Sequence, residues 1–232
     1  MTVSGSEYQK NVFVTPSADF SEKRLNKLNK TVVLLVISAI LYLLIGGGGM
    51  YKICKSEQSA QRQRELEAGL LELMLVNDYQ DISISDLCEH LQIPRKSFYR
   101  YFDNKDGAFL ALIDHTLEDC NNFIDPQTNS LDGLQQYFSF WLEKKSLLDA
   151  MSRSGLAGKL IDRSFHFATS DLGFVNRLLR HYPDVDHGMV IMFLSTGMLS
   201  TVLHWHHTGL KQTPQQMADT ITRVFSSPFL PF

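Results

Sequence analysis

The side chains best suited to bind another molecule gather between positions 85 and 105, where hydroxyls, phenols and cations alternate with apolar residues. Arg, Lys, Ser and Tyr hold DNA phosphates, and the first residues of a recognition helix reach base edges. The chain has a net charge of −3, yet positions 94–105 carry four cations against one carboxylate. Positive charge focused in this way favours a specific DNA site over indiscriminate coating of nucleic acid. The candidate DNA-contacting residues are Ser85, Arg95, Lys96, Ser97, Tyr99, Arg100, Tyr101 and Lys105.

Two short helices joined by a tight turn are predicted to present these side chains. Ser83 can accept hydrogen bonds at a helix start, and Asp86 can reciprocate from the third helical position. Gln92 ends this helix, and Pro94 begins a second one, where its missing N–H is no loss. An apolar stripe at helical spacing supports the first helix: Ile84, Leu87, Cys88 and Leu91. Two aromatic residues of the second segment are expected to point inward: Phe98 and Phe102. The pattern predicts a helix-turn-helix, with an ordinary hairpin that has a solvated basic face as the alternative.

Positions from about 62 to 113 resemble the DNA-binding domain of the TetR/AcrR family of bacterial regulators. Arg64–Asn77 resembles that family's first helix, and Asn104–Phe109 resembles the start of its fourth. Ser97–Phe102 resembles the family's signature of a small residue, an apolar residue, Tyr, any residue, His or Tyr, and Phe. Gln92 stands where the family often has Gly, and Pro94 where it usually has a Ser or Thr cap. The resemblance implies a DNA-binding domain at positions 57–113 and an effector and dimerisation domain at positions 114–232.

The fold class is predicted to be all-α, since no strand-like alternation or internal repeat appears. The last helix is expected to open with a capping box at Thr213–Gln216, with Pro at its first position, and to run to about Phe225. Gly209 is a plausible stop for the helix before it. The remaining expected helices are Gly107–Phe123, Leu131–Lys144, Leu147–Ser152, Gly155–Ala168, Leu172–His181 and His187–His207.

The second domain is expected to pair two chains and, in the resembled family, to bind an effector. A flat surface of small and apolar residues could mediate the homodimer: Met189, Met192, Phe193, Thr196, Gly197, Ser200 and Thr201. Large adaptable side chains could surround a small molecule: Phe138, Trp141, Phe165, Phe174 and Met198. For any one residue of either set, a place in the ordinary core is the competing interpretation.

The first fifty residues allow several interpretations. Positions 1–30 are polar, and positions 31–51 are uncharged over 21 residues, which is long enough to cross a bilayer. One hypothesis is a transmembrane helix that anchors a cytoplasmic DNA-binding domain to the inner membrane. Another is a buried or partner-binding apolar helix. A third is upstream sequence that is not translated, with a start at Met50, because four Gly codons would resemble a ribosome-binding sequence.

Catalytic and metal chemistry find no support in the sequence. His204 and His207 are three apart on a helix and could share a metal, but no ligating Cys, Asp or Glu lies within the same turn. No nucleophile elbow and no phosphate-binding glycine loop occurs, so neither an enzyme nor a cofactor is predicted. Three cysteines without paired spacing fit a reduced cytoplasm.

The predicted function is a sequence-specific transcriptional regulator, a ligand-responsive repressor that binds a double-stranded operator as a homodimer. The alternative is a membrane-tethered regulator or an interaction protein that uses the helix-turn-helix structurally.

Overall fold

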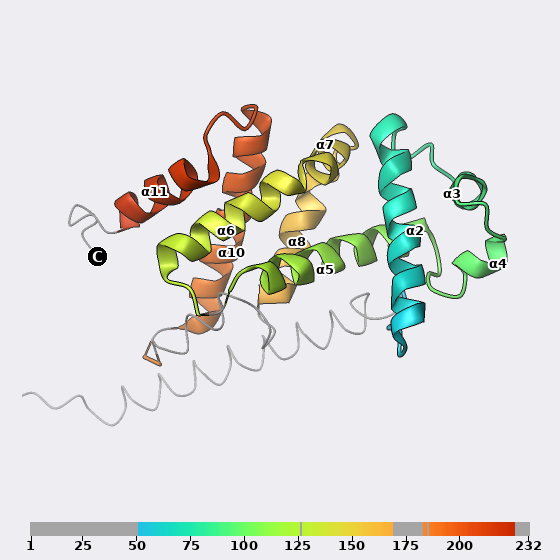
Figure 1. Ribbon diagram of the computed structural model, residues 1–232, viewed down its shortest axis with the longest axis horizontal. Helices are drawn as coiled ribbons and strands as arrows, with labels where there is room; N and C mark the ends of the chain where they lie inside the picture. Colours follow the sequence, from blue (N-terminus) through green and yellow to red (C-terminus); the bar gives the residue numbers. More distant parts are fainter. Residues whose placement is uncertain (1–50, 126, 169–182, 185, 226–232) are drawn as a thin grey trace, which may run out of the picture. The chain divides into compact units, whose positions relative to one another are not determined.

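The computed structural model describes residues 51–125, 127–168, 183–184 and 186–225 (Figure 1). Every regular element within these ranges is a helix, and one isolated antiparallel bridge joins Tyr51 to Phe102. The predicted all-α class is confirmed. The expected helix Leu172–His181 lies outside the described residues. So does the apolar segment 31–51, apart from Tyr51.

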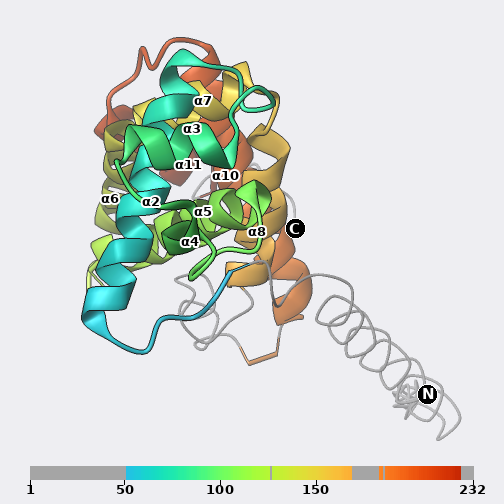
Figure 2. The same cartoon turned by 90° about the vertical axis from the view of Figure 1, so that its right-hand side faces the viewer.

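The N-terminal half consists of α2 (Glu57–Val76), α3 (Ile84–His90), α4 (Arg95–Phe98) and the first part of α5 (Lys105–Phe123). Figure 2 shows α3 beside α2; α2 contacts both α3 and α5, and α4 contacts α3. The expected start of the first helix at Arg64 is wrong, because Ser56 caps α2 by accepting a hydrogen bond from the backbone N–H of Ser59. The polar residues that open α2 have no apolar periodicity, so the sequence pattern did not mark them.

The local signals around α3 are confirmed. Ser83 and Asp86 form the complete capping box, with bonds of 3.2 Å and 2.8 Å in the two directions. Gln92 adopts a φ of 53° in the turn, where glycine is the usual residue. Pro94 is the N-cap of α4, and that helix ends at Phe98, so Phe102 lies just beyond it. Both Phe98 and Phe102 are nevertheless fully buried, as predicted.

The C-terminal half contains α6 (Ser130–Glu143), α7 (Lys145–Arg153), α8 (Ala157–Ala168), α10 (His187–His207) and α11 (Pro214–Phe225). Thr213 and Gln216 form the predicted capping box at the start of α11. Gly209, with a φ of 88°, follows α10 as expected. The expected helix Gly155–Ala168 begins too early. Gly155 has a φ of 67° and ends α7, because the N–H of Leu156 turns back to the carbonyl of Met151.

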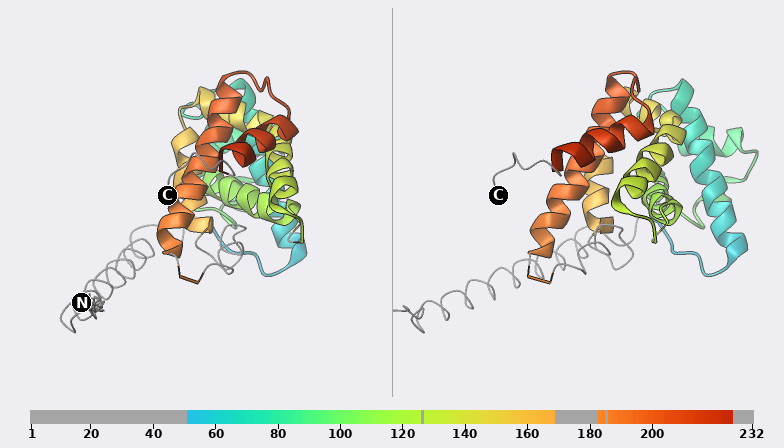
Figure 3. Two further views of the ribbon diagram at one scale, coloured as in Figure 1. Left: turned by 90° about the vertical axis from the view of Figure 1, so that its left-hand side faces the viewer. Right: turned by 60° about the vertical axis from the view of Figure 1, so that its left-hand side comes forward.

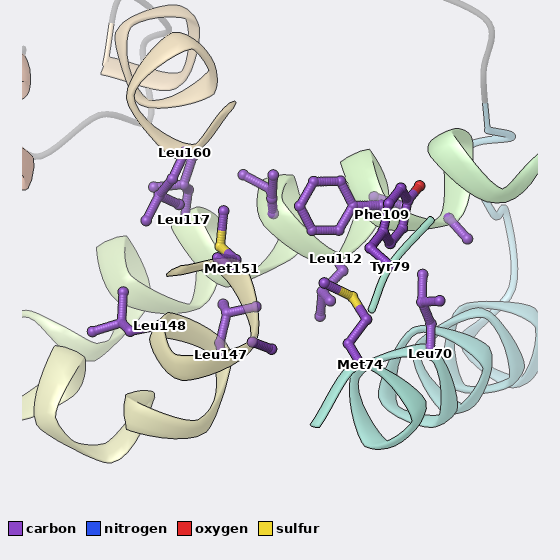
Figure 4. Close-up of a cluster of buried hydrophobic side chains, with 14 of the residues drawn as sticks. Leu70, Met74, Tyr79, Phe109, Leu112, Leu117, Leu147, Leu148, Met151 and Leu160 are labelled. Atoms are coloured by element: carbon purple, nitrogen blue, oxygen red, sulfur yellow. The ribbon is translucent and has the colours of Figure 1, made fainter. Parts of the chain in front are cut away.

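One hydrophobic core joins the two halves through α5. Figure 4 shows Phe109, Leu112 and Leu117 of α5 between side chains of α2 on one side and of α7 and α8 on the other. Figure 3 shows the outer helices, in which α11 packs along α6 and α10 along α8. The labelled partners of α5 in this core are Leu70, Met74, Tyr79, Leu147, Leu148, Met151 and Leu160. A displacement of α5 would therefore affect both the N-terminal half and the C-terminal half.

Candidate nucleic-acid interface

The outer face of α4 and of the turn that follows it is polar and basic. Arg95, Lys96 and Arg100 are exposed, and 43% of the surface of Tyr99 is accessible to solvent. Ser97 and Tyr101 are half-buried, and Ser85 of α3 is exposed. The structure thus brings seven of the eight predicted residues to the surface of α3, α4 and their flanking turns.

A rigid aromatic base supports this face. The rings of Phe98 and Phe102 lie 5.2 Å apart beneath α4, and the ring of Tyr99 meets that of Phe98 edge-on at 5.5 Å. Tyr99 in turn accepts a weak hydrogen bond of 3.4 Å from the guanidinium of Arg95. Because α4 has only four residues, this packing rather than its backbone hydrogen bonds must hold it in place.

The turn before α4 fixes the angle between the two helices. The N–H of Gln92 donates to the carbonyl of Glu89 at 3.0 Å, and the N–H of Ile93 donates to the carbonyl of Cys88 at 2.9 Å. These two bonds form the Schellman arrangement, with Gln92 in the left-handed position. The departure from glycine noted in the sequence is thus accommodated in the backbone without loss of the turn.

Lys105 differs from the other predicted residues because its ammonium group already has several partners. It donates to the carbonyl oxygens of Tyr79 at 2.5 Å, Ile82 at 2.6 Å and Gln80 at 3.3 Å. It also lies 4.3 Å from the centre of the Tyr79 ring. Partial burial lowers the pKa of Lys105. Lys105 therefore clasps the loop between α2 and α3, and a phosphate contact by the same group stays a prediction.

The phenol of Tyr79 completes this clasp. Its hydroxyl donates a hydrogen bond of 2.5 Å to Asp106 on α5. Burial, followed by the neighbouring carboxylate of Asp106, raises the pKa of Tyr79 well above its ordinary value. The phenol therefore stays protonated and keeps donating at neutral pH.

Comparison with known proteins identifies both halves of the chain. Residues 68–112 match the family of bacterial regulatory proteins of the tetR type, and residues 128–227 match a transcriptional regulator C-terminal region of the same class. The chain belongs to the TetR family. The helix-turn-helix that this TetR-family protein shares with its relatives lies where the basic face is found, so the protein is a DNA-binding transcriptional regulator by fold.

Solved structures show the same fold at low sequence identity. A putative TetR-family regulator from Syntrophomonas wolfei is 13% identical, with a TM-score of 0.57 over 75% of this chain and 99% of its own. A TetR-family regulator from Streptomyces coelicolor is 20% identical, with a TM-score of 0.51 over 72% and 79%. The dihydroxyacetone kinase operon activator DhaS is 13% identical, with a TM-score of 0.53 over 70% and 93%. No curated protein sequence matches this TetR-family chain.

The predicted ligand-binding residues fall in different environments in this TetR-family chain. Phe138 and Trp141 are fully buried on α6, and the ring of Phe138 meets that of Trp205 at 5.7 Å. Met198 is half-buried on α10. Phe174 and the side chain of Phe165 lie outside the described residues. The two aromatic residues of α6 are thus part of the core of the C-terminal half.

The histidines at the end of α10 show no metal-like grouping. His206 pairs with Asp149 of α7 at 2.7 Å, while His204 and His207 are exposed. In the ranges that the structure describes, no three His, Cys, Asp or Glu side chains come together as metal ligands would. Within the same ranges α10 alone is long and apolar enough to cross a membrane, a test that core helices of soluble proteins also pass.

Several polar pairs between distant helices were missed from the sequence. Glu67 of α2 is almost fully buried and binds the ring of His115 at 2.8 Å. Asp114 binds the Arg163 guanidinium of α8. Burial raises the pKa of the Glu67 carboxyl, while its bond to His115 opposes that shift. The available signal was an acidic residue next to buried apolar positions, since a carboxylate there needs a partner.

Proposed function

We propose that this TetR-family regulator binds a specific double-stranded operator as a homodimer, represses transcription from it, and releases it when a small molecule binds. The observation that carries the proposal is the exposed basic face of α4 and the turn after it, which holds Arg95, Lys96 and Arg100 on a buried aromatic base. A short recognition helix reaches few bases, so two of them related by two-fold symmetry are needed to read a full site. The proposed site of action is DNA in the cytoplasm.

Selection of duplexes from a random library with the purified protein tests operator binding directly. An enriched duplex should contain an inverted repeat, and Lys96→Ala should weaken its binding and reduce the slope of log Kd against log salt by about 0.9. Lys159, which is exposed on α8, supplies the matched control, and Lys159→Ala should change neither quantity. Failure to enrich any duplex would refute the proposal.

The proposed dimer surface lies on α10 and α11. Met189, Met192 and Phe193 of α10 have 71%, 52% and 64% of their surface exposed, and Phe225 of α11 has 56% exposed. The opposite face of α10 is buried in the core, so the exposed apolar residues are left for a partner. Large apolar side chains gathered on one surface are typical of interfaces between identical chains.

Sedimentation equilibrium tests this surface. Phe193→Lys should convert a dimer into a monomer, because the new charge would have to be desolvated at the interface. Leu142→Lys on α6, where 38% of the wild-type side chain is exposed, is the control and should leave the dimer intact. A dimer that survives the change at Phe193 would exclude this face of α10.

Repression needs only occupancy of promoter DNA, so it is the simplest consequence of operator binding. A protein of similar fold is named as an operon activator, so this fold also occurs in a protein that activates transcription. A reporter gene behind the selected operator distinguishes the two, since repression predicts lower expression when the regulator is present. An effector should raise the operator Kd by favouring a state that binds DNA less tightly. Compounds that raise the melting temperature of the free protein are the ones to test.

A further inference from the structure

Residues 51–52 form a strap that is paired with the end of the recognition segment. Tyr51 makes an antiparallel bridge with Phe102, and the N–H of Lys52 donates to the carbonyl of Tyr101 at 2.8 Å. The ammonium of Lys52 also donates to the carbonyl of Tyr99 at 3.2 Å. From α2, the buried amide of Gln63 donates to the carbonyl of Lys52 at 3.1 Å. The strap therefore holds the turn that leads out of α4.

The side chain of Tyr51 connects this strap to the C-terminal half. Its hydroxyl donates to Asp114 Oδ2 of α5 at 2.7 Å. The same carboxylate accepts from Arg163 of α8, with Nε at 2.6 Å from Oδ1 and a second guanidinium nitrogen on Oδ2. The side chains of Arg163 and Asp114 are only 10% and 16% exposed. A continuous chain of polar contacts thus runs from α8, through α5, to the backbone beside α4.

These contacts can transmit a displacement of α8 to the strap. A bidentate pair between arginine and a carboxylate fixes direction as well as distance, and it is strongest when it is shielded from water. Burial, then the hydrogen bond to Asp114, raises the pKa of Tyr51 above its ordinary value, so the phenol remains a donor. The Tyr51 ring also meets the His115 ring edge-on at 6.0 Å. Any shift of α8 relative to α5 must therefore either move the strap with it or break the buried ion pair between Arg163 and Asp114.

We propose that Tyr51 is a positioning residue for operator binding, and that the Tyr51–Asp114–Arg163 contact couples the position of α8 to that of the recognition helix. The inference rests on the proposed binding of an operator by α4. It assigns to the residues that precede α2 a role in regulation, since α8 packs against α10 in the C-terminal half. A change in the C-terminal half that displaces Arg163 would remove the group that orients Asp114, weaken the bond from Asp114 to Tyr51 and so loosen the end of α4.

A double-mutant cycle with the full-length chain tests this coupling. The variants are Tyr51→Phe, which removes one hydroxyl, Arg163→Gln, and their combination, with the duplex selected by the wild-type protein as the probe. We expect Arg163→Gln to raise the operator Kd about tenfold in the wild-type background and less than about twofold in the Tyr51→Phe background. Affinity for a scrambled duplex should be equal in all four proteins, because the exposed cations of α4 are unchanged.

A matched ionic pair provides the control. Arg64 of α2 makes a two-pronged contact with Asp119 of α5, at 2.9 Å and 3.0 Å, without touching the strap. Arg64→Gln should therefore change operator affinity by the same factor in the wild-type and Tyr51→Phe backgrounds. Should Arg163→Gln fail to fold, Arg163→Lys keeps the charge but loses the two-pronged geometry and replaces it in the cycle.

The outcomes separate the two proposals. Operator binding by the wild-type protein with additive effects of Tyr51→Phe and Arg163→Gln overturns the coupling alone. Equal coupling for scrambled and selected duplexes overturns it too, because that result would reflect general loss of folding. A wild-type chain that enriches no duplex refutes the DNA-binding proposal, and the positioning role of Tyr51 falls with it.

Discussion

Replacing Gln92 by glycine should stabilise this protein. Gln92 has a φ of 53° in the turn between α3 and α4, and its side chain is exposed. A residue with a Cβ loses about 1–2 kcal/mol in the left-handed region. Glycine avoids that loss but gives up about 0.5–1 kcal/mol more backbone entropy on folding. The middle of the two ranges predicts that Gln92→Gly raises the free energy of unfolding by about 0.75 kcal/mol, within an outer range of about 0–1.5 kcal/mol.

Urea denaturation measures the change. The midpoint should rise while the slope of the free energy against urea stays constant, because the surface exposed on unfolding is the same. Gln92→Ala is the control, since it removes the same exposed side chain but keeps the Cβ, and it should fall within about 0.5 kcal/mol of the wild type. Operator affinity should be unchanged, because the hydrogen bonds of the turn come from the backbone of Gln92 and Ile93.

Two results would refute this reasoning. Equal stability of the glycine and alanine variants would mean that the strain of the left-handed conformation at this turn is no larger than the extra backbone entropy that glycine loses. A glycine variant that is more stable but binds the operator less tightly would mean that the Gln92 side chain itself contacts DNA. The second result would add Gln92 to the DNA-contacting residues, next to Arg95 and Lys96 at the start of α4.

Three further predictions follow from single groups. Lys105→Met should lower the free energy of unfolding by about 1.5–3 kcal/mol, since three carbonyls lose a charged donor, and should leave the salt slope of operator binding unchanged. A slope reduced by about 0.9 would instead reveal a phosphate contact. Ser83→Ala should cost about 1 kcal/mol at neutral pH. The Ser83 hydroxyl and the Ser83 backbone N–H both lower the pKa of Asp86, and alanine keeps only the backbone bond. The part of the difference that comes from the lost hydroxyl is therefore present above the ordinary carboxyl pKa and should disappear as pH falls through the lowered value, as acid-range unfolding curves would show. Burial raises the pKa of the Cys120 thiol, so mass spectrometry should find Cys120 unalkylated by iodoacetamide at pH 8 until the protein unfolds.

The features that sequence reasoning predicted well depend on neighbours within a few positions. The capping boxes at Ser83 and Thr213 each use a residue three positions on, and the structure forms both. The turn at Gln92 could likewise be predicted from the sequence, because the apolar stripe stops there and a proline follows two residues later. Such bonds are local in the chain, so residue type and spacing suffice to identify them.

The features that were missed depend on partners that are far apart in the chain. Tyr51 and Asp114 are 63 positions apart, and Glu67 and His115 are 48 positions apart. Nothing near Tyr51 marks it as more than a lead into α2, because its bridge to Phe102 exists only once α2 and α5 have packed. Two of the predicted ligand residues illustrate the same limit of sequence reasoning. Phe138 and Trp141 have the composition of a binding wall, but α6 turns them into the core.

The fold changes which cations place positive charge at the recognition helix. Counting cations along positions 94–105 treats Lys105 as equal to Lys96, although three carbonyl oxygens surround the ammonium of Lys105 and Lys96 is exposed. The same count omits Lys52, which lies more than forty positions earlier and is brought to the carbonyl of Tyr99 by the strap. The positive potential at the recognition helix is therefore assembled from two distant segments. Since the strap also carries Tyr51, a rearrangement that released it from Asp114 would move a cation away from the DNA-binding face and loosen α4 in the same step.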